Sequence, residues 1–160
     1  MFLDLTENTS QNVYSYLVGA ISPRPIAWIS TLNSEGIANI APYSFFTVAS
    51  CKPPVLSVTQ VNPSDKTNKD TLSNLMATKE CVVNIVSQEL VEKMNQSCAN
   101  YPSDISEFDA ANIAQAPSLL VNAPSVAGSK VRFECKLREV ISISNEPGGG
   151  KMMLLDVVGI

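Results

Sequence analysis

The chain has 160 residues, of which 45% are hydrophobic and 16% charged, with a formal net charge of -4. This length and composition predict one globular domain over residues 1–160 with a hydrophobic core. The acidic balance argues against a nucleic-acid partner, and no stretch approaches the roughly 20 consecutive apolar residues that span a membrane. The N-terminus lacks the basic start of a signal peptide, so we expect a cytoplasmic protein.

The sequence contains no histidine, and its four cysteines are Cys51, Cys81, Cys98 and Cys135. The lack of histidine excludes Ser-His-Asp and Cys-His nucleophile arrangements and argues against a zinc site. We expect reduced, mostly buried thiols, and for Cys98 an inert thiol is favoured over a reactive one. If the protein is an enzyme, a cofactor is expected to supply the chemistry.

Strand-like segments dominate the chain. In order they are residues 25–32, 37–41, 55–59, 81–86, 131–138 and 152–158. A turn with Gly36 joins the first pair, and residues 145–150 form a flexible hairpin before the last strand. Pro42 cannot donate to a sheet ladder, so the second strand is expected to end or bulge there. Because the chain stops inside a strand pattern, we expect the natural sequence to continue beyond Ile160.

Three short helices are predicted between the strands. Asp70 is a candidate N-cap for the first helix, Ser87 for the second, and Ser106 with Asp109 for the third. The residues expected to face the core are Leu72, Leu75 and Met76 in the first helix and Leu90, Val91 and Met94 in the second. Strands without regular βαβ alternation favour an antiparallel barrel with peripheral helices.

Three stretches can bind a ligand, and each has a simpler alternative. Residues 39–46 combine small and aromatic side chains around Pro42 and can admit a flat ring, although a core turn packed with Phe is favoured on the residues alone. Residues 68–75 place Lys69 and Thr71 at a helix start that suits a phosphate, the alternative being an ordinary capped helix. Arg24, held between two prolines, can reach a phosphate or lie on the surface.

Taken in order, these stretches resemble the flavin reductase-like family of FMN-binding split barrels. The resemblance rests on residues 22–31, the turn at Gly36, and residues 39–46, 53–56, 69–71 and 133–137. It implies a mainly β fold, a six-stranded antiparallel Greek-key split barrel with flanking helices. It also implies a homodimer with the flavin near the subunit interface.

By the same resemblance, FMN rather than FAD is expected to bind, with its phosphate held by Lys69 and Thr71 at the helix start and with Asp70 organising that turn. The full set of implied cofactor-binding residues is Arg24, Asn39, Ala41, Pro42, Tyr43, Ser44, Ser57, Thr59, Lys69, Asp70, Thr71 and Asn100. Tyr101 falls where the family often brings a segment toward the flavin. No catalytic side chain and no metal are expected.

The implied activity is hydride transfer from NADH or NADPH to flavin N5, with electrons passed to a separate monooxygenase or another acceptor. Two alternatives stay open: an FMN-binding or electron-transfer protein without nicotinamide turnover, and a barrel that serves as an interaction domain without a cofactor.

Overall fold

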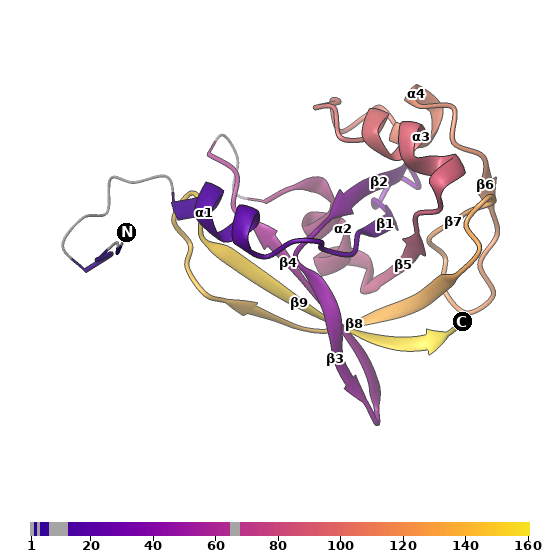
Figure 1. The fold of residues 1–160 in the computed structure, drawn as a ribbon. Coiled ribbons are helices and arrows are strands. Elements are labelled where there is room, and N and C mark those ends of the chain that lie inside the picture. Colours follow the sequence, from indigo (N-terminus) through magenta and orange to yellow (C-terminus); the bar gives the residue numbers. More distant parts are fainter. Residues whose placement is uncertain (1, 3, 7–12, 65–67) are drawn as a thin grey trace.

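The structure, a computed structural model, describes residue 2 and residues 4–6, 13–64 and 68–160. In the part described, a curled antiparallel sheet of seven strands is accompanied by short helices and by a separate two-stranded sheet (Figure 1). The helices are α1 (Val13–Ala20), α2 (Asp70–Thr78), α3 (Val91–Gln96), which follows a 3-10 turn at Gln88–Leu90, and α4 (Glu107–Ala110). None of these helices is long and apolar enough to cross a membrane.

The main sheet has the order β2-β1-β5-β8-β9-β4-β3, and β6 pairs with β7. The strands are β1 (Ala27–Leu32), β2 (Ala38–Tyr43), β3 (Phe46–Cys51), β4 (Pro54–Val61), β5 (Glu80–Ile85), β6 (Gln115–Ala116), β7 (Ser125–Val126), β8 (Arg132–Ser142) and β9 (Gly150–Gly159). The mainly β fold with flanking helices is confirmed. The sheet has seven strands rather than six, because β3 pairs with β4 in a hairpin that extends away from the rest of the sheet (Figure 1).

The path of β2 corrects one prediction. The strand neither ends nor bulges at Pro42, since its register with β1 runs without a shift from Ala38 to Tyr43 and pairs Pro42 with Trp28. β2 lies at the edge of the sheet, where a residue without an N–H can leave its unpaired side outward and remove no ladder hydrogen bond. The turn before β2 is as predicted, with Gly36 at φ 82°.

The helices differ from the sequence prediction at their ends and faces. Lys69, not Asp70, occupies the N-cap position of α2. Met76 is 49% exposed and Val91 44% exposed, so neither faces the core as expected. In α2 the polar Thr71 and Asn74 are buried beside Leu72 and Leu75, which turns the buried face away from Met76.

The serines predicted as caps for the other helices precede the 3-10 turn and α4 without a side-chain capping bond. The Ser106 hydroxyl donates instead to the carbonyl of Ala38 on β2.

Two hydrophobic clusters lie on the two sides of β1. One fills the inside of the curled sheet and includes Ile29, Val58 and Met153 together with Leu72 of α2. The other surrounds Trp28 and Phe108 and joins α4 to β1 and β2. Cys81 and Cys135 are buried in the first cluster, whereas Cys51 and Cys98 are exposed, so the expectation of mostly buried thiols holds for only one pair.

Candidate functional site

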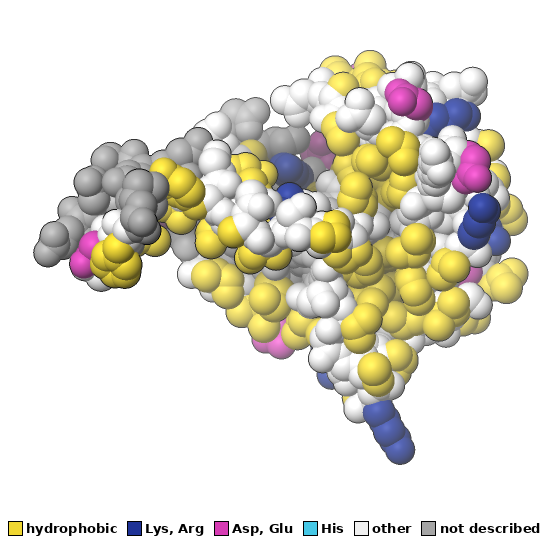
Figure 2. Space-filling view, viewed as in Figure 1, with side chains coloured by type: hydrophobic (Ala, Val, Ile, Leu, Met, Phe, Trp, Pro, Cys, Tyr) yellow, Lys and Arg dark blue, Asp and Glu magenta, His cyan; other side chains and the backbone are white. Residues whose placement is uncertain are grey.

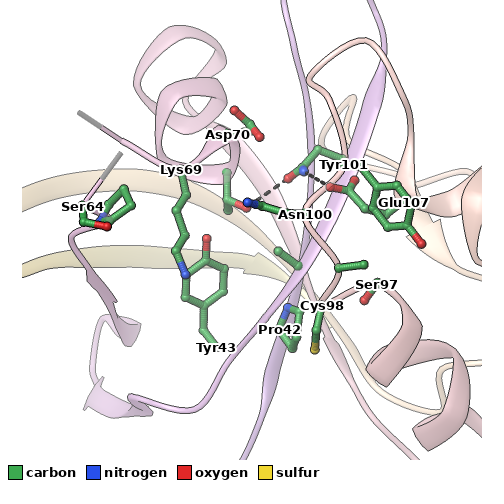
Figure 3. A pocket seen from close by; sticks show the side chains of 15 residues that line it. Pro42, Tyr43, Ser64, Lys69, Asp70, Ser97, Cys98, Asn100, Tyr101 and Glu107 are labelled. Carbon is green, nitrogen blue, oxygen red and sulfur yellow. Dashed lines mark hydrogen bonds between the residues drawn. The ribbon is translucent and has the colours of Figure 1, made fainter. Parts of the chain in front are cut away.

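A cavity of about 520 Å³ opens between β2, the start of α2 and the connection from α3 to α4. We call it the β2–α2 cavity (Figure 3). Most of the residues expected to bind a cofactor meet here, namely Asn39, Ala41, Pro42, Tyr43, Lys69, Asp70, Thr71 and Asn100, and Tyr101 lies with them. They come together because the edge strand β2 runs beside α2, which follows it by about 30 residues in sequence.

Four predicted residues, Arg24, Ser44, Ser57 and Thr59, do not line this cavity. The Arg24 guanidinium donates to the carbonyl oxygens of Val18 and Ile21 at the end of α1, and its Nε lies 3.4 Å from Ser44 Oγ. A basic side chain in this position satisfies carbonyls that a helix end leaves without partners. Ser57 and Thr59 lie on β4 between β3 and β9, opposite Leu154 and Met152 of β9.

Glu107 of α4 is a cavity residue that the sequence analysis missed. Its carboxylate accepts hydrogen bonds from Asn39 Nδ2 at 2.8 Å and from the Ile40 N–H at 3.0 Å. Desolvation raises the pKa of Glu107, and the nearby charge of Asp70 adds to the effect while the Ile40 N–H opposes it. No local pattern marks this residue, because the capping-box spacing after Ser106 draws attention to Asp109 instead.

Hydrogen bonds between side chains fix α2 against β1 and β2. The Thr71 hydroxyl donates to Asn39 Oδ1 at 3.0 Å, and Asn74 Nδ2 donates to the Thr31 hydroxyl at 3.1 Å. Asn39 thus joins Thr71 on one side to Glu107 on the other. The polar residues buried on α2 are therefore satisfied by this network, as buried polar groups generally are.

Tyr43 is an exception to that rule. It is only 6% exposed, and its hydroxyl makes no hydrogen bond of normal geometry with the described residues, although the Thr71 hydroxyl lies close enough to lower its pKa. Burial raises the pKa of Tyr43 well above its ordinary value, so the hydroxyl keeps its proton and is a donor. An unpartnered donor in a cavity wall costs free energy until a ligand supplies an acceptor.

The start of α2 makes the cavity attractive to an anion. The first N–H groups of a helix have no acceptor within the helix, and the dipole places partial positive charge there. Lys69 precedes the first turn, and its Nζ lies 5.9 Å from the centroid of the Tyr43 ring (Figure 3). Lys69 is the single cation among the described residues that line the cavity.

Residues 97–101 form the opposite wall. The Trp28 indole donates to Ser97 Oγ at 2.9 Å, and Ser97 in turn donates to the carbonyl of Met94. Burial raises the pKa of the Cys98 thiol and nearby Lys69 opposes this, so the cavity does not activate the thiol. An inert role for Cys98 stays a prediction.

A family model described as the flavin reductase like domain matches residues 19–153. The chain belongs to this flavin reductase-like family. An uncharacterised protein of Aquifex aeolicus is 42% identical over 137 residues, which is 86% of this chain and 70% of that protein.

Solved structures share the flavin reductase-like fold over almost the whole chain. Nitrilotriacetate monooxygenase component B from Bacillus cereus has a TM-score of 0.92 at 30% identity, covering 99% of this chain and 79% of that one. The 2-nitrobenzoate 2-nitroreductase of Pseudomonas fluorescens has a TM-score of 0.86 at 30% identity, covering 99% and 75%. Against curated relatives, the chain spans from 55% to 70% of their length.

Proposed function

We propose that the β2–α2 cavity binds FMN and that the protein is an NAD(P)H-dependent flavin oxidoreductase. The observation that carries the proposal is the placing of an unpartnered buried donor, Tyr43, beside Lys69 and the start of α2 in one cavity. Membership of the flavin reductase-like family supports it. So does the fold shared with a monooxygenase component and a nitroreductase.

The lining residues fit a flavin in shape and in polarity. A cavity of about 520 Å³ lies within the range typical of small-molecule sites. Ala41 and Pro42 offer apolar surface for a flat ring system, and the Tyr43 hydroxyl would donate to a polar atom of the ligand. The start of α2, with Lys69, would hold the terminal phosphate. Among the described lining residues, Lys69 is the one cation and it stands at a single helix start, an arrangement that suits the single phosphate of FMN.

A bound flavin would accept a hydride from NADH or NADPH and release the electrons to a further acceptor. The chain's own part is to orient the ring, to anchor the phosphate and to keep donors near the ring edge. No side chain need act as an acid or base in this scheme, which agrees with a sequence that contains no histidine.

We further propose that the protein is a cytoplasmic homodimer that supplies a separate monooxygenase or another acceptor. α1 contains no buried residue, and Leu17, Ile21 and Val48 are each more than half exposed. Hydrophobic side chains also gather on the middle of the face shown in Figure 2. Extended apolar surface of this kind favours association with another protein surface. The likeness to a monooxygenase component supports the proposed acceptor.

The test is a visible spectrum of the purified protein, followed by titration with FMN and anaerobic addition of NADH or NADPH. Flavin bands that bleach rapidly would establish the oxidoreductase. Bound flavin that stays oxidised with both nucleotides would contradict the activity and favour an FMN-binding or electron-transfer protein. No FMN binding would contradict the cofactor itself and favour an interaction domain.

A further inference from the structure

The hydrogen-bond chain Glu107–Asn39–Thr71 has a direction that the charge of Glu107 sets. An ionised carboxylate can only accept, so Asn39 must turn its Nδ2 toward Glu107, at 2.8 Å, and its Oδ1 toward Thr71. The Thr71 hydroxyl therefore donates to Asn39 Oδ1, at 3.0 Å. The direction of these hydrogen bonds therefore follows from which groups can donate and which can accept, and not only from the orientation of the Asn39 side-chain amide.

This direction leaves Thr71 poorly suited to an anion. A hydroxyl has one proton, and in Thr71 that proton is used by Asn39. Toward the cavity the Thr71 oxygen then presents only lone pairs. A phosphate oxygen is also an acceptor, so the two would repel each other where a hydrogen bond is needed.

A single proton added to Glu107 reverses the chain. Glu107 keeps the hydrogen bond from the Ile40 N–H on one oxygen and donates through the other to Asn39 Oδ1 after the amide turns over. Asn39 Nδ2 then donates to Thr71 Oγ1, and the Thr71 proton becomes free to point into the cavity. Thr31, whose hydroxyl lies 3.4 Å from Asn39 Oδ1, tolerates either amide orientation because a hydroxyl both donates and accepts.

We propose that Glu107 is a positioning residue whose protonation reverses the Glu107–Asn39–Thr71 chain and makes Thr71 a donor to the phosphate of bound flavin. This rests on the proposed function, which places that phosphate at the start of α2. Glu107 is 7% exposed but lines the cavity, so a proton can reach it from solvent. Its pKa is already raised, chiefly by desolvation, which favours uptake of a proton.

Other ionisable groups near Glu107 come from every wall of the cavity. They are Lys69 and Asp70 at the start of α2, Tyr43 of β2, and Cys98 and Tyr101 of the connection before α4, while Asp109 lies on α4 itself outside the cavity lining. Between pH 5 and pH 8, Tyr43 and Cys98 carry no charge, because burial raises the pKa of each. The phosphate of the ligand also titrates, with a pKa of about 6. Its contribution to the pH dependence of affinity must therefore be separated from that of Glu107 by comparing variants.

The direction in which FMN affinity changes with pH follows from the linkage between ligand binding and proton binding. The phosphate favours protonated Glu107, so the pKa of Glu107 is higher with ligand than without it. Binding then takes up a proton, and affinity falls as the pH rises from the free to the bound pKa, by at most about tenfold per pH unit for one proton. A group merely needed for folding would give no such proton-linked change in affinity.

The test measures FMN and riboflavin affinity by flavin fluorescence from pH 5 to pH 8. Glu107→Gln should hold the reversed state, because its amide accepts from the Ile40 N–H and donates to Asn39. We expect it to bind FMN about tenfold more tightly than wild type at pH 8, with the difference shrinking as the pH falls and wild-type Glu107 takes up its proton. Riboflavin, which has no phosphate, should show no difference. Asp109→Asn, a matched loss of an exposed charge on α4, should behave as wild type.

Thr71→Val separates the proposed chain from simple charge repulsion. In that background Glu107→Gln should change FMN affinity by less than about twofold, and Thr71→Ser should restore the full effect. An undiminished effect in Thr71→Val would overturn the proposal in favour of direct repulsion.

Calorimetry in buffers of different ionisation enthalpy gives a second measurement that does not need Glu107→Gln to fold. Proton uptake on FMN binding should be larger in wild type than in Thr71→Val, and equal uptake would overturn the proposal. FMN binding with parallel pH profiles in wild type and folded Glu107→Gln would overturn this inference alone. Absence of FMN binding would overturn the proposed function as well.

Discussion

One wall of the β2–α2 cavity is held by side-chain hydrogen bonds between several elements, whereas the facing wall is bonded to another element at its first residue. On the first wall, Glu107, Asn39 and Thr71 are joined by hydrogen bonds and join α4, β2 and α2. On the second, residues 98–100 are exposed, and the bond from Trp28 to Ser97 fixes the start of the segment. The first wall is therefore organised before a ligand arrives, while the second can adjust to it.

The largest effect should come from breaking the organised wall. Glu107→Ala removes the acceptor for both Asn39 and the Ile40 N–H and leaves two donors without partners in a buried site. We expect the free energy of unfolding at pH 8 to fall by about 3 kcal/mol, measured by urea denaturation. Asp109→Ala, an exposed carboxylate on the same helix, should change it by less than about 0.5 kcal/mol. Equal losses would mean that the network adds nothing beyond the helix itself.

The cation on the organised wall should govern affinity and not stability. Lys69→Ala removes an exposed ammonium beside the start of α2, so we expect FMN binding to weaken about tenfold while riboflavin binding stays the same. Fluorescence titration of both flavins measures this. Lys136→Ala, which removes an exposed cation on β8 outside the cavity, is the matched control. Unchanged FMN affinity in a folded Lys69→Ala variant would contradict the placement of the phosphate beside Lys69.

Loosening the second wall should have a smaller effect. Trp28→Phe keeps most of the buried aromatic surface but deletes the donor to Ser97. We expect a loss of about 1 kcal/mol in stability and faster hydrogen exchange confined to residues 97–101. Hydrogen exchange followed by mass spectrometry resolves this segment. If exchange instead increases along β2, the two walls are not independent.

The smallest expected effect has the opposite sign. Tyr43→Phe removes a buried hydroxyl that makes no hydrogen bond of normal geometry with the described residues, so at most a weak interaction with the Thr71 hydroxyl is lost. We expect the protein without flavin to be unchanged or more stable by up to about 1 kcal/mol, with weaker FMN binding. Thermal denaturation with and without FMN measures both. A less stable variant without flavin would show that the hydroxyl has a structural partner.

The sequence alone determined six of the seven strands of the main sheet, the Gly36 turn and their order, because these depend on residues close together in the chain; it did not reveal β3 or α1. Alternation at residues 131–138 predicts a half-buried strand wherever its partners lie, and in β8 Cys135 and Leu137 are indeed less exposed than Lys136 and Arg138, whereas Val131 is 41% exposed and precedes the strand. Gly36 suits a turn that needs positive φ, which it adopts. The family resemblance rests on the same local patterns in their order.

Only the tertiary structure decided which contacts the individual residues make and which of them line the cavity. Pro42 stays in its strand because β2 is an edge strand, which no local pattern around it reveals. Arg24 completes the end of α1 and does not line the cavity. Glu107 reaches Asn39 across 68 residues of sequence, and a hydrogen bond between such distant residues depends on the packing of α4 against β2. Buried polar contacts of this kind are set by which elements meet, and that is a property of the whole fold.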